Sequence, residues 1–386
     1  MKGQNNMNET ELTALRHEFH RFPELGFAEH STKDRIASLL TSFGLEVHIG
    51  VGVVGVLKRG TGNRTIGLRA DIDALPISET SAHAYVSKTD GVMHACGHDG
   101  HMTMLLGAAE NLARGDSFDG TVIFIFQPNE EHGLGAQAMI KEGLLRRFPM
   151  EEVYAIHNLP GALAGRISTR TGQICSSESL FEITVKGQGG HAAMPHVGRD
   201  SILIGSEIVL ALQTIVARKL APGSGAVVSV TEFLTDGQRN VLPSNVVLKG
   251  DVRACVLKDR KAISAFMTQI CEGIGDAHGA KVSVAFNTEF IETINAAVPV
   301  IAAVKAAKSI GIEATSDREP MSFSEDFAHF SAVVPGCFML LGNGTDGPNG
   351  RPLHSADYDF NDQLLPIGAA FWTQLVTDRL PKAVSL

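Results

Sequence analysis

The spacing of apolar side chains in the first 180 residues alternates between helical and strand-like periods. Apolar positions recur on one face of 11–22 and of 31–43, which predicts two helices, with Ser31 as a plausible N-cap of the second. Apolar runs rich in Val and Ile predict strands over 46–58, 65–70, 120–127 and 153–156. Strands that alternate with helices predict an α/β domain with a mostly parallel sheet.

The pattern changes between about residues 180 and 290. It predicts strands over 181–188, 226–236, 246–255 and 281–287, and helices over 200–219 and 259–278, with Asp200 as a cap. This order, β-α-β-β-α-β, is that of a ferredoxin-like domain. The α/β pattern then returns, with helices over 298–310 and 362–379 and a strand over 337–342. We therefore expect one α/β domain of residues 1–178 and 290–386, with a smaller domain of residues 179–289 inserted into it.

The bulk properties limit the classes of partner. The chain has 386 residues, a formal net charge of −9 and no cluster of Lys or Arg, so nucleic acid and anionic membranes are poor candidate partners. No apolar run approaches the length of a membrane span, and the first six residues do not resemble the apolar core of a signal peptide. Five cysteines without a framework spacing fit a reducing compartment, so we expect a cytoplasmic protein.

The segment 94–101, HACGHDGH, concentrates candidate metal ligands between glycines that allow sharp turns. Thiolate and imidazole are the usual ligands of zinc and related ions. Cys96 and His98 are two residues apart, so both side chains can point the same way. Helical spacing from Met102 on predicts that they lie on a loop leading into a helix. A cysteine beside surface histidines is the simpler alternative.

Further candidate ligands come directly after successive predicted strands. They are Asp73, Glu130, Glu131 and His157. Sites in α/β sheets lie at the carboxyl ends of strands. A glutamate pair at such a place is costly unless a cation balances it. The repeated pattern predicts metal binding, whereas Asp71 alone is interpreted as a turn or capping residue.

Seven short motifs then stand in a recognisable order. They are RADIDALP at 69–76, HACGHDGH at 94–101, QPNEE at 127–131, HNLPG at 157–161, GGHAAMPH at 189–196, SEDF at 324–327 and LHS at 353–355. With them the chain closely resembles the dinuclear metal amidohydrolases that include hippurate hydrolases, auxin–amino acid conjugate hydrolases and bacterial N-acyl-amino-acid deacylases. The resemblance covers nearly the whole chain. Asn129, where relatives often carry alanine, is a mild departure for which we expect little effect.

The resemblance implies a site with two divalent metal ions per subunit, which could be zinc, manganese, cobalt or nickel. Cys96 would bridge the two ions. The other ligands would be Glu131 and His354 on one ion, and His98 and His157 on the other. Glu130 would be the general base, and Asp73 would support the ligands.

The resemblance also assigns residues outside the metal ligands. His191 and Asn240 would reach the active site of the neighbouring subunit and stabilise the oxyanion, and Arg253 would bind the substrate carboxylate. A surface ion pair is an equally good interpretation of Arg253. His101 is expected to support the ligands or cap the helix, and Asp326 to be structural.

Together these implications point to a cytoplasmic enzyme that hydrolyses the amide bond of small-molecule N-acyl-L-amino acids. The larger domain would be catalytic, and the inserted one would be a dimerisation or lid domain in a homodimer or dimer-based oligomer. A dipeptidase or an N-carbamoyl-amino-acid hydrolase on the same scaffold is the first alternative. A catalytically silent metal- or peptide-binding protein is the second, and such a protein would be expected to lack Glu130.

Overall fold

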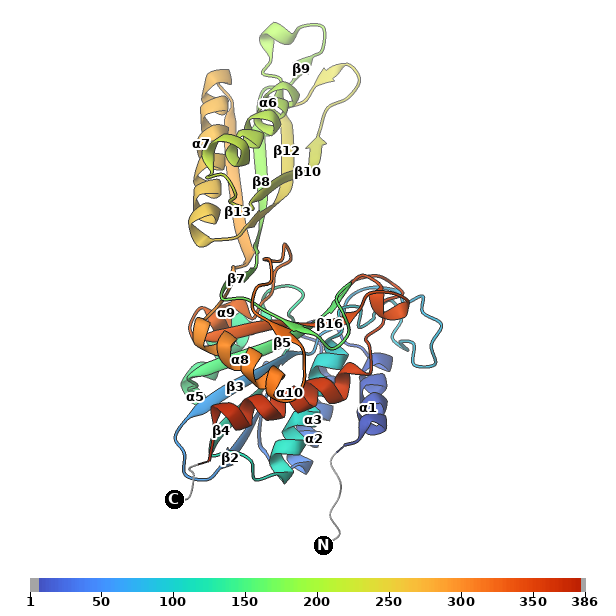
Figure 1. Ribbon diagram of the computed structural model, residues 1–386. Coiled ribbons are helices and arrows are strands. Elements are labelled where there is room, and N and C mark those ends of the chain that lie inside the picture. The colour runs from blue at the N-terminus through green and yellow to red at the C-terminus, as the bar shows by residue number, and fades with distance from the viewer. Residues whose placement is uncertain (1–6, 383–386) are drawn as a thin grey trace. The chain divides into compact units, whose positions relative to one another are not determined.

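The computed structural model describes residues 7–382, which form two compact units (Figure 1). The first unit comprises the described chain up to Ile174, the segment Thr293–Glu319 and the described chain from Asp326 on. The second comprises Cys175–Glu292 and the short segment Pro320–Glu325. The first unit is built on a mixed sheet with helices and the second on an antiparallel sheet with two helices, so the predicted fold class is confirmed.

An eight-stranded sheet organises the first unit, in the order β1-β2-β4-β3-β5-β16-β6-β15. The strands are β1 (Glu46–Ile49), β2 (Val53–Arg59), β3 (Thr65–Asp71), β4 (Gly120–Gln127), β5 (Glu152–Pro160), β6 (Ile167–Ser168), β15 (Ala314–Thr315) and β16 (Gly336–Gly344). The central strands β4, β3, β5 and β16 run parallel to one another. Their carboxyl ends therefore meet at one edge of the sheet.

Helices cover this sheet. They are α1 (Glu9–Arg21), α2 (His30–Ser42), α3 (His98–Arg114), α4 (Gly135–Glu142), α5 (Leu144–Arg147), α8 (Ala297–Ser309), α9 (Ala328–Ser331), α10 (Leu364–Arg379) and the 3₁₀ turn η3 (Pro348–Gly350). Phe124 and Phe126 of β4 belong to the core that α3 and α10 share, while Ile123 and Ile125 are buried on the other face of the strand. This is the double covering that the continuous apolar run of β4 predicts.

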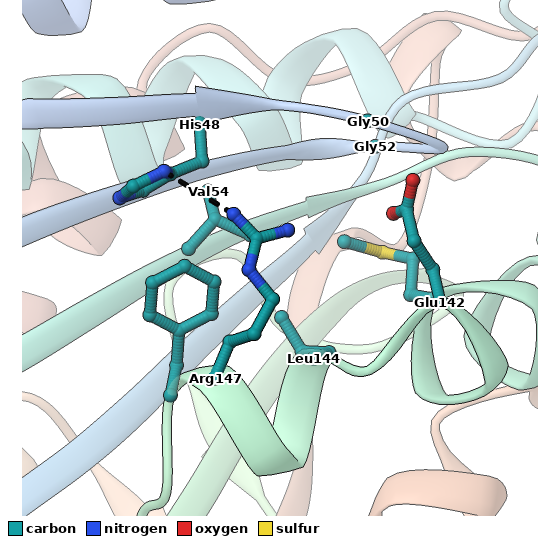
Figure 2. A pocket seen from close by; sticks show the side chains of 9 residues that line it. His48, Gly50, Gly52, Val54, Glu142, Leu144 and Arg147 are labelled. Carbon is teal, nitrogen blue, oxygen red and sulfur yellow. Dashed lines mark hydrogen bonds between the residues drawn. The ribbon is translucent and has the colours of Figure 1, made fainter.

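The segment expected to be one strand over 46–58 is a hairpin instead. Strands β1 and β2 pair antiparallel, and Gly50 and Gly52 lie between them. A Cβ atom on Gly50 would lie 2.5 Å from the carboxylate oxygens of Glu142, and one on Gly52 would lie 2.4 Å from the carbonyl oxygen of Phe126. Glu142 also accepts a hydrogen bond from the Val51 N–H (3.1 Å), beside the small pocket of Figure 2. The turn therefore packs so closely against Glu142 and the Phe126 carbonyl that only glycine fits at positions 50 and 52.

Two helices begin at other residues than predicted. Helix α2 begins at His30, so Ser31 lies within its first turn and is not the N-cap. The Glu24 carboxylate accepts the N–H groups of Ser31 (3.1 Å) and Thr32 (2.8 Å), which replaces a local cap. Helix α3 begins at His98, so the second half of the HACGHDGH segment is helical and not a loop.

The second unit has the ferredoxin-like order. Its elements are β8 (Ser177–Lys186), α6 (Ser201–Thr214), β10 (Val227–Thr235), β12 (Asn245–Ala254), α7 (Leu257–His278) and β13 (Lys281–Phe290). The sheet order is β10-β12-β8-β13, with every neighbouring pair antiparallel. The side chain of Asp200 accepts the N–H groups of Ile202 and Leu203, so the predicted cap of α6 is confirmed.

Short elements complete the two units. β9 (Gly190–His191) pairs with β11 (Val241–Leu242), β7 (Gly172–Cys175) pairs with β14 (Thr293–Asn295), and η1 (Pro195–Val197) is a 3₁₀ turn.

The segment Ser201–Lys219 joins α6 to a π-helical turn, η2 (Ile215–Lys219), and by length and composition alone it could cross a membrane. The expectation that no apolar run approaches that length is thus corrected for this segment. Ile204, Ile208 and Leu212 on its inner face are buried in the core of the second unit. On its outer face Leu203 is 58% and Leu210 73% exposed. The high hydropathy therefore comes from a helix that is apolar on two faces.

Candidate active site

The parallel strands of the first unit bring distant parts of the sequence to one edge of the sheet. Asp71 ends β3, Glu130 follows β4, and His157 lies in the last part of β5. The backbone N–H of Ile72 still donates to the carbonyl oxygen of Gln127 (3.0 Å), so the chains leaving β3 and β4 stay together beyond the sheet. This is the position at which the sequence pattern predicts a site.

The start of α3 adds the Cys96 loop to this edge. Gly97 adopts a left-handed conformation (φ 92°) between Cys96 and the first helical residue, His98. A Cβ atom on Gly97 would lie 2.3 Å from Asn158 Oδ1 and 2.6 Å from Tyr358 Oη. A glycine is therefore required by both the backbone angle and the space.

His354 reaches the same place from the C-terminal part of the chain. Its backbone N–H donates to the carbonyl oxygen of Ala95 (2.8 Å). Its φ of 65° is uncommon for a residue with a side chain, and such backbone strain is concentrated at functional sites. The side chain is 51% exposed, so this member of the cluster faces solvent.

The structure brings the five expected ligands together as two groups that share Cys96. Cys96, His98 and His157 form one group, and Cys96, Glu131 and His354 form the other; within each, the possible ligand atoms lie within 4.8 Å of one another. Cys96 Sγ is 3.3 Å from His157 Nε2, and His354 Nε2 is 3.4 Å from Glu131 Oε2. Two donor groups with one thiol in common match the chemistry of two neighbouring ions with a shared ligand.

Hydrogen bonds fix which imidazole nitrogen faces the cluster. His157 Nδ1 lies 2.7 Å from the carbonyl oxygen of Asn158, and His98 Nδ1 lies 2.9 Å from that of Asp73. Because a carbonyl oxygen only accepts, each Nδ1 donates its proton there and each Nε2 faces the cluster. His98 Nε2 and Glu131 Oε1 are buried, yet neither hydrogen bonds to any residue within 7–382. Such atoms need a partner, and a metal ion fits this donor set.

Asp73 connects the two halves of the cluster. Its Oδ1 lies 3.2 Å from His98 Nδ1, and its Oδ2 accepts the backbone N–H of Glu131 (3.1 Å). The side chain is buried and supports one candidate ligand from each half.

The residues of the cluster create a field that favours positive charge. Burial, together with Glu131 and Glu130, raises the pKa of the Cys96 thiol well above its usual range. Burial lowers the pKa of His98, but Asp71 and Asp73 outweigh it and raise that pKa to about 10. The carboxylates thus attract cations to this point.

Asp71 belongs to a buried network, and its interpretation as a turn or capping residue is wrong. It accepts from Arg69 Nη1 (2.8 Å) and pairs with His101 Nδ1 (2.7 Å). Burial raises its pKa, but His98, His101 and Arg69 together hold that pKa well below the usual range. His101 Nε2 in turn lies 3.0 Å from the backbone N–H of Asn158. Both ring nitrogens of His101 are therefore engaged around the ligands. The sequence showed Arg69 and Asn158 only as members of motifs.

Glu130 and its turn are held from two sides. The backbone N–H of Asp326 donates to Glu130 Oε1 (3.3 Å), and the Asp326 carboxylate itself accepts Gln127 Nε2 (2.7 Å). Glu29 Oε1 accepts the backbone N–H of Asn129 (2.9 Å), whose φ is 49°. Glu130 Oε2 lies 4.0 Å from His98 Nε2, so the carboxylate borders the candidate ligands.

The other candidate residues lie in the second unit. His191 and Asn240 are exposed on the ribbon of β9 and β11, where the Asn240 carbonyl oxygen accepts the N–H of Ala192 (3.1 Å). Arg253 lies on β12 and pairs with Glu178 (2.7 Å) and Asp251 (2.9 Å). Its guanidinium is thus engaged by two carboxylates of its own unit.

Comparison with known proteins now identifies the family. Residues 67–378 match the model of "Peptidase family M20/M25/M40". The chain belongs to the M20/M25/M40 family. It is 38% identical over 370 residues to the hippurate hydrolase of Campylobacter jejuni, with 95% of each chain covered. It is 33% identical over 372 residues to the N-acetylcysteine deacetylase of Bacillus subtilis, with 95% and 96% covered.

A solved structure supports the same family. The YXEP protein of Bacillus subtilis, described as a dinuclear metal binding peptidase of the M20 family, superposes with a TM-score of 0.85 at 29% identity, with 96% of this chain and 98% of that chain covered. Membership of the M20/M25/M40 family makes the protein a metal-dependent amidohydrolase. The resemblance inferred from the seven motifs is confirmed.

Proposed function

We propose that this protein hydrolyses the amide bond of N-acyl-L-amino acids and releases a free amino acid and a carboxylic acid. The observation that carries this proposal is the pair of donor groups that share Cys96, with the Glu130 carboxylate beside them. The names of the hippurate hydrolase and the N-acetylcysteine deacetylase favour this substrate class. The presence of Glu130 argues against a catalytically silent binding protein.

Two divalent ions would occupy the donor groups, and zinc, manganese, cobalt and nickel all suit thiolate, imidazole and carboxylate ligands. Cys96 would bridge the ions. His98 and His157 would complete the ligands of one ion, and Glu131 and His354 those of the other. When bound, such ions polarise the substrate carbonyl and lower the pKa of a coordinated water.

Glu130 would move the protons of the reaction. Its carboxylate is buried and fixed by the Asp326 N–H, so it keeps one position beside the site. There it would take a proton from the attacking water and pass it to the leaving amide nitrogen. The carboxylate of the next residue, Glu131, lies beside His354 (3.4 Å), so the two carboxylates can serve different purposes.

We further propose that the first unit is the catalytic domain and the second a dimerisation or lid domain. β10 is an edge strand on which Leu234 is 49% exposed, and α6 exposes Leu203 and Leu210. Exposed edges and apolar faces favour pairing between subunits. In such a homodimer His191 and Asn240 would act in the neighbouring subunit's site. Arg253 would bind the substrate carboxylate only by giving up Glu178 or Asp251.

The direct test is a substrate panel at one enzyme concentration. N-acetyl-, N-benzoyl-, indoleacetyl- and carbamoyl-amino acids and simple dipeptides are incubated with protein loaded with each of the four metals, and the released amino acid is measured. We expect N-acyl-amino acids to be cleaved fastest, and the Glu130→Gln protein to cleave none at a comparable rate. Faster cleavage of dipeptides or carbamoyl compounds would replace the proposal by the corresponding alternative. The cytoplasmic location is proposed with the function and is tested by cell fractionation.

A further inference from the structure

The first unit contains a further group of imidazole and carboxylate donors, which shares no residue with the donor groups around Cys96. His20 on α1 meets Glu79 and His83, which lie on the segment between β3 and α3. Glu79 Oε1 is 3.3 Å from His20 Nε2 and 3.1 Å from His83 Nε2.

We propose that His20, Glu79 and His83 bind a third divalent cation of the zinc class. Zinc bonds to imidazole nitrogen and carboxylate oxygen are about 2.0–2.2 Å long, so neighbouring ligand atoms in a tetrahedral site lie about 3.3–3.5 Å apart. Contacts of 3.1 and 3.3 Å between Glu79 and the two imidazoles are close to this spacing. Three protein ligands leave a fourth position for water.

The hydrogen bonds of His20 prepare it as a ligand. Its Nδ1 lies 2.8 Å from Asp99 Oδ2, and Arg16 Nε donates to the same oxygen (3.0 Å). The Asp99 carboxylate is ionised beside the Arg16 guanidinium and can only accept. His20 Nδ1 therefore carries a proton, and its Nε2 faces Glu79. A histidine held by a carboxylate at one nitrogen and a metal at the other is a common arrangement in metal sites.

His83 supports the proposed cation site separately, because its ring nitrogens have no hydrogen-bond partner among the described residues. Both its ring nitrogens are buried, and neither forms a hydrogen bond with any residue of the described chain, although Nε2 is close to Glu79. The contact is therefore short without the alignment of a hydrogen bond, as expected for two ligands directed at one ion. Its ring is stacked on Tyr85 at 3.9 Å, which fixes its orientation. The side chain is 17% exposed, so an ion can enter from solvent.

Protonation of His20 alone, without a bound metal ion, explains the surroundings of Glu79 less well. The Glu79 side chain is 2% exposed, and its Oε2 already accepts the backbone N–H of Ser87 (2.6 Å). One imidazolium at His20 would satisfy Glu79 but would leave the nitrogens of His83 without partners. A divalent ion gives a partner to Nε2 of both imidazoles and to Glu79 Oε1, and it fastens residues 79–87 to α1.

The test compares two variants on either side of Tyr85. His83→Phe keeps a ring on Tyr85 but removes the ligand. His17→Phe is the matched control, because His17 stacks on Tyr85 at 3.5 Å but belongs to none of the donor groups. Each chelator-treated protein is dialysed against Zn²⁺, and the zinc per folded subunit is measured. We expect His83→Phe to bind one ion fewer than the wild type and His17→Phe to match the wild type. Equal zinc content in all three proteins would overturn the proposal.

Two further measurements keep this result independent of the active site. Cys96→Ser should lower zinc binding whether or not His83 is present, so the two losses should add. In the cobalt-loaded proteins, the difference spectrum between wild type and His83→Phe should lack a thiolate-to-cobalt band, and its presence would contradict a separate site. If His83→Phe does not fold, Glu79→Gln takes its place, since its amide oxygen can still accept the Ser87 N–H; a wild-type zinc content in that variant would equally overturn the site.

Discussion

Glu130 and Glu131 are adjacent in the sequence but have different surroundings, so we expect their substitution to have different effects. Glu130 accepts the Asp326 N–H and shares a donor group with His98 and Glu131. Glu131 lies 3.4 Å from His354 and is also in the group of Cys96. We predict that Glu130→Gln lowers turnover by about 10²–10⁴-fold, the usual effect of losing a general acid–base, while the metal content stays near that of the wild type. Glu131→Gln should instead lose metal.

Metal analysis and single-turnover rates on the same preparations check this prediction. Glu151→Gln is a suitable control, because that side chain is 53% exposed and lies outside the donor groups. Wild-type turnover in Glu130→Gln would show that the proton is moved by another group.

Glu29 gives a prediction of pH dependence. Burial and the nearby Asp73 carboxylate raise its pKa from 4.5 to about 7, although the Asn129 N–H works in the opposite direction. A carboxyl group with a raised folded-state pKa destabilises the fold once it ionises. The wild type should therefore lose stability relative to Glu29→Gln as pH rises from about 4.5 to 7, by about 2–3 kcal/mol, since one pKa unit corresponds to about 1.4 kcal/mol.

Denaturant unfolding of chelator-treated wild type and Glu29→Gln at several pH values measures this difference. Chelation keeps bound cations from lowering the pKa of Glu29. A stability difference that does not change between pH 5 and pH 8 would show that Glu29 titrates normally.

At the scale of the element, the entry into α3 depends on one glycine. We predict that Gly97→Ala destabilises the fold by about 2–4 kcal/mol, because left-handed backbone strain adds to a clash with Asn158 and Tyr358. Gly91→Ala separates the two terms, since Gly91 also has a positive φ (70°) but has open space around its Cβ position. It should cost only about 1 kcal/mol, the strain alone.

Chemical denaturation of both variants compares the two costs. Because Gly97 separates Cys96 from His98, metal affinity should fall in Gly97→Ala and not in Gly91→Ala. Equal destabilisation by the two substitutions would mean that the packing around Asn158 is loose.

At the scale of the whole molecule, we predict that catalysis needs a dimer with His191 acting across the interface. Inactive His191→Ala and Glu130→Gln proteins are mixed under conditions of subunit exchange. A mixed dimer then has one site with its own Glu130 and the partner's His191, so activity should partly return. Loss of an oxyanion donor costs about 10²–10³-fold, so recovery is readily measured.

The control mixture combines His191→Ala with Asn240→Ala. Each site of that mixed dimer lacks one of the two residues from its partner, so no complete site forms. Recovery in the control, or none in the test mixture despite demonstrated exchange, would contradict action in trans.

The sequence by itself determined most of the longer helices and strands, and it predicted candidate metal ligands at the ends of strands. Continuous apolar runs define β4 and β5, because strands buried on both faces need apolar side chains at every position. The β-α-β-β-α-β order defines the ferredoxin-like unit, and the density of ligand types at 94–101 points to metal. These features are local in sequence, so periodicity and residue type suffice to find them.

Only the tertiary structure decided by which contacts distant side chains meet, including Cys96 and His354, which the family resemblance implies as ligands of one ion. His354 and Cys96 are far apart in the sequence, and the hydrogen bond from the His354 N–H to Ala95 brings them together. The Asp71–His101 pair and the cluster of His20, Glu79 and His83 join separate segments in the same way. Such contacts leave no periodic trace in the sequence, because they depend on how strands and helices pack and on the few angstroms available between their side chains.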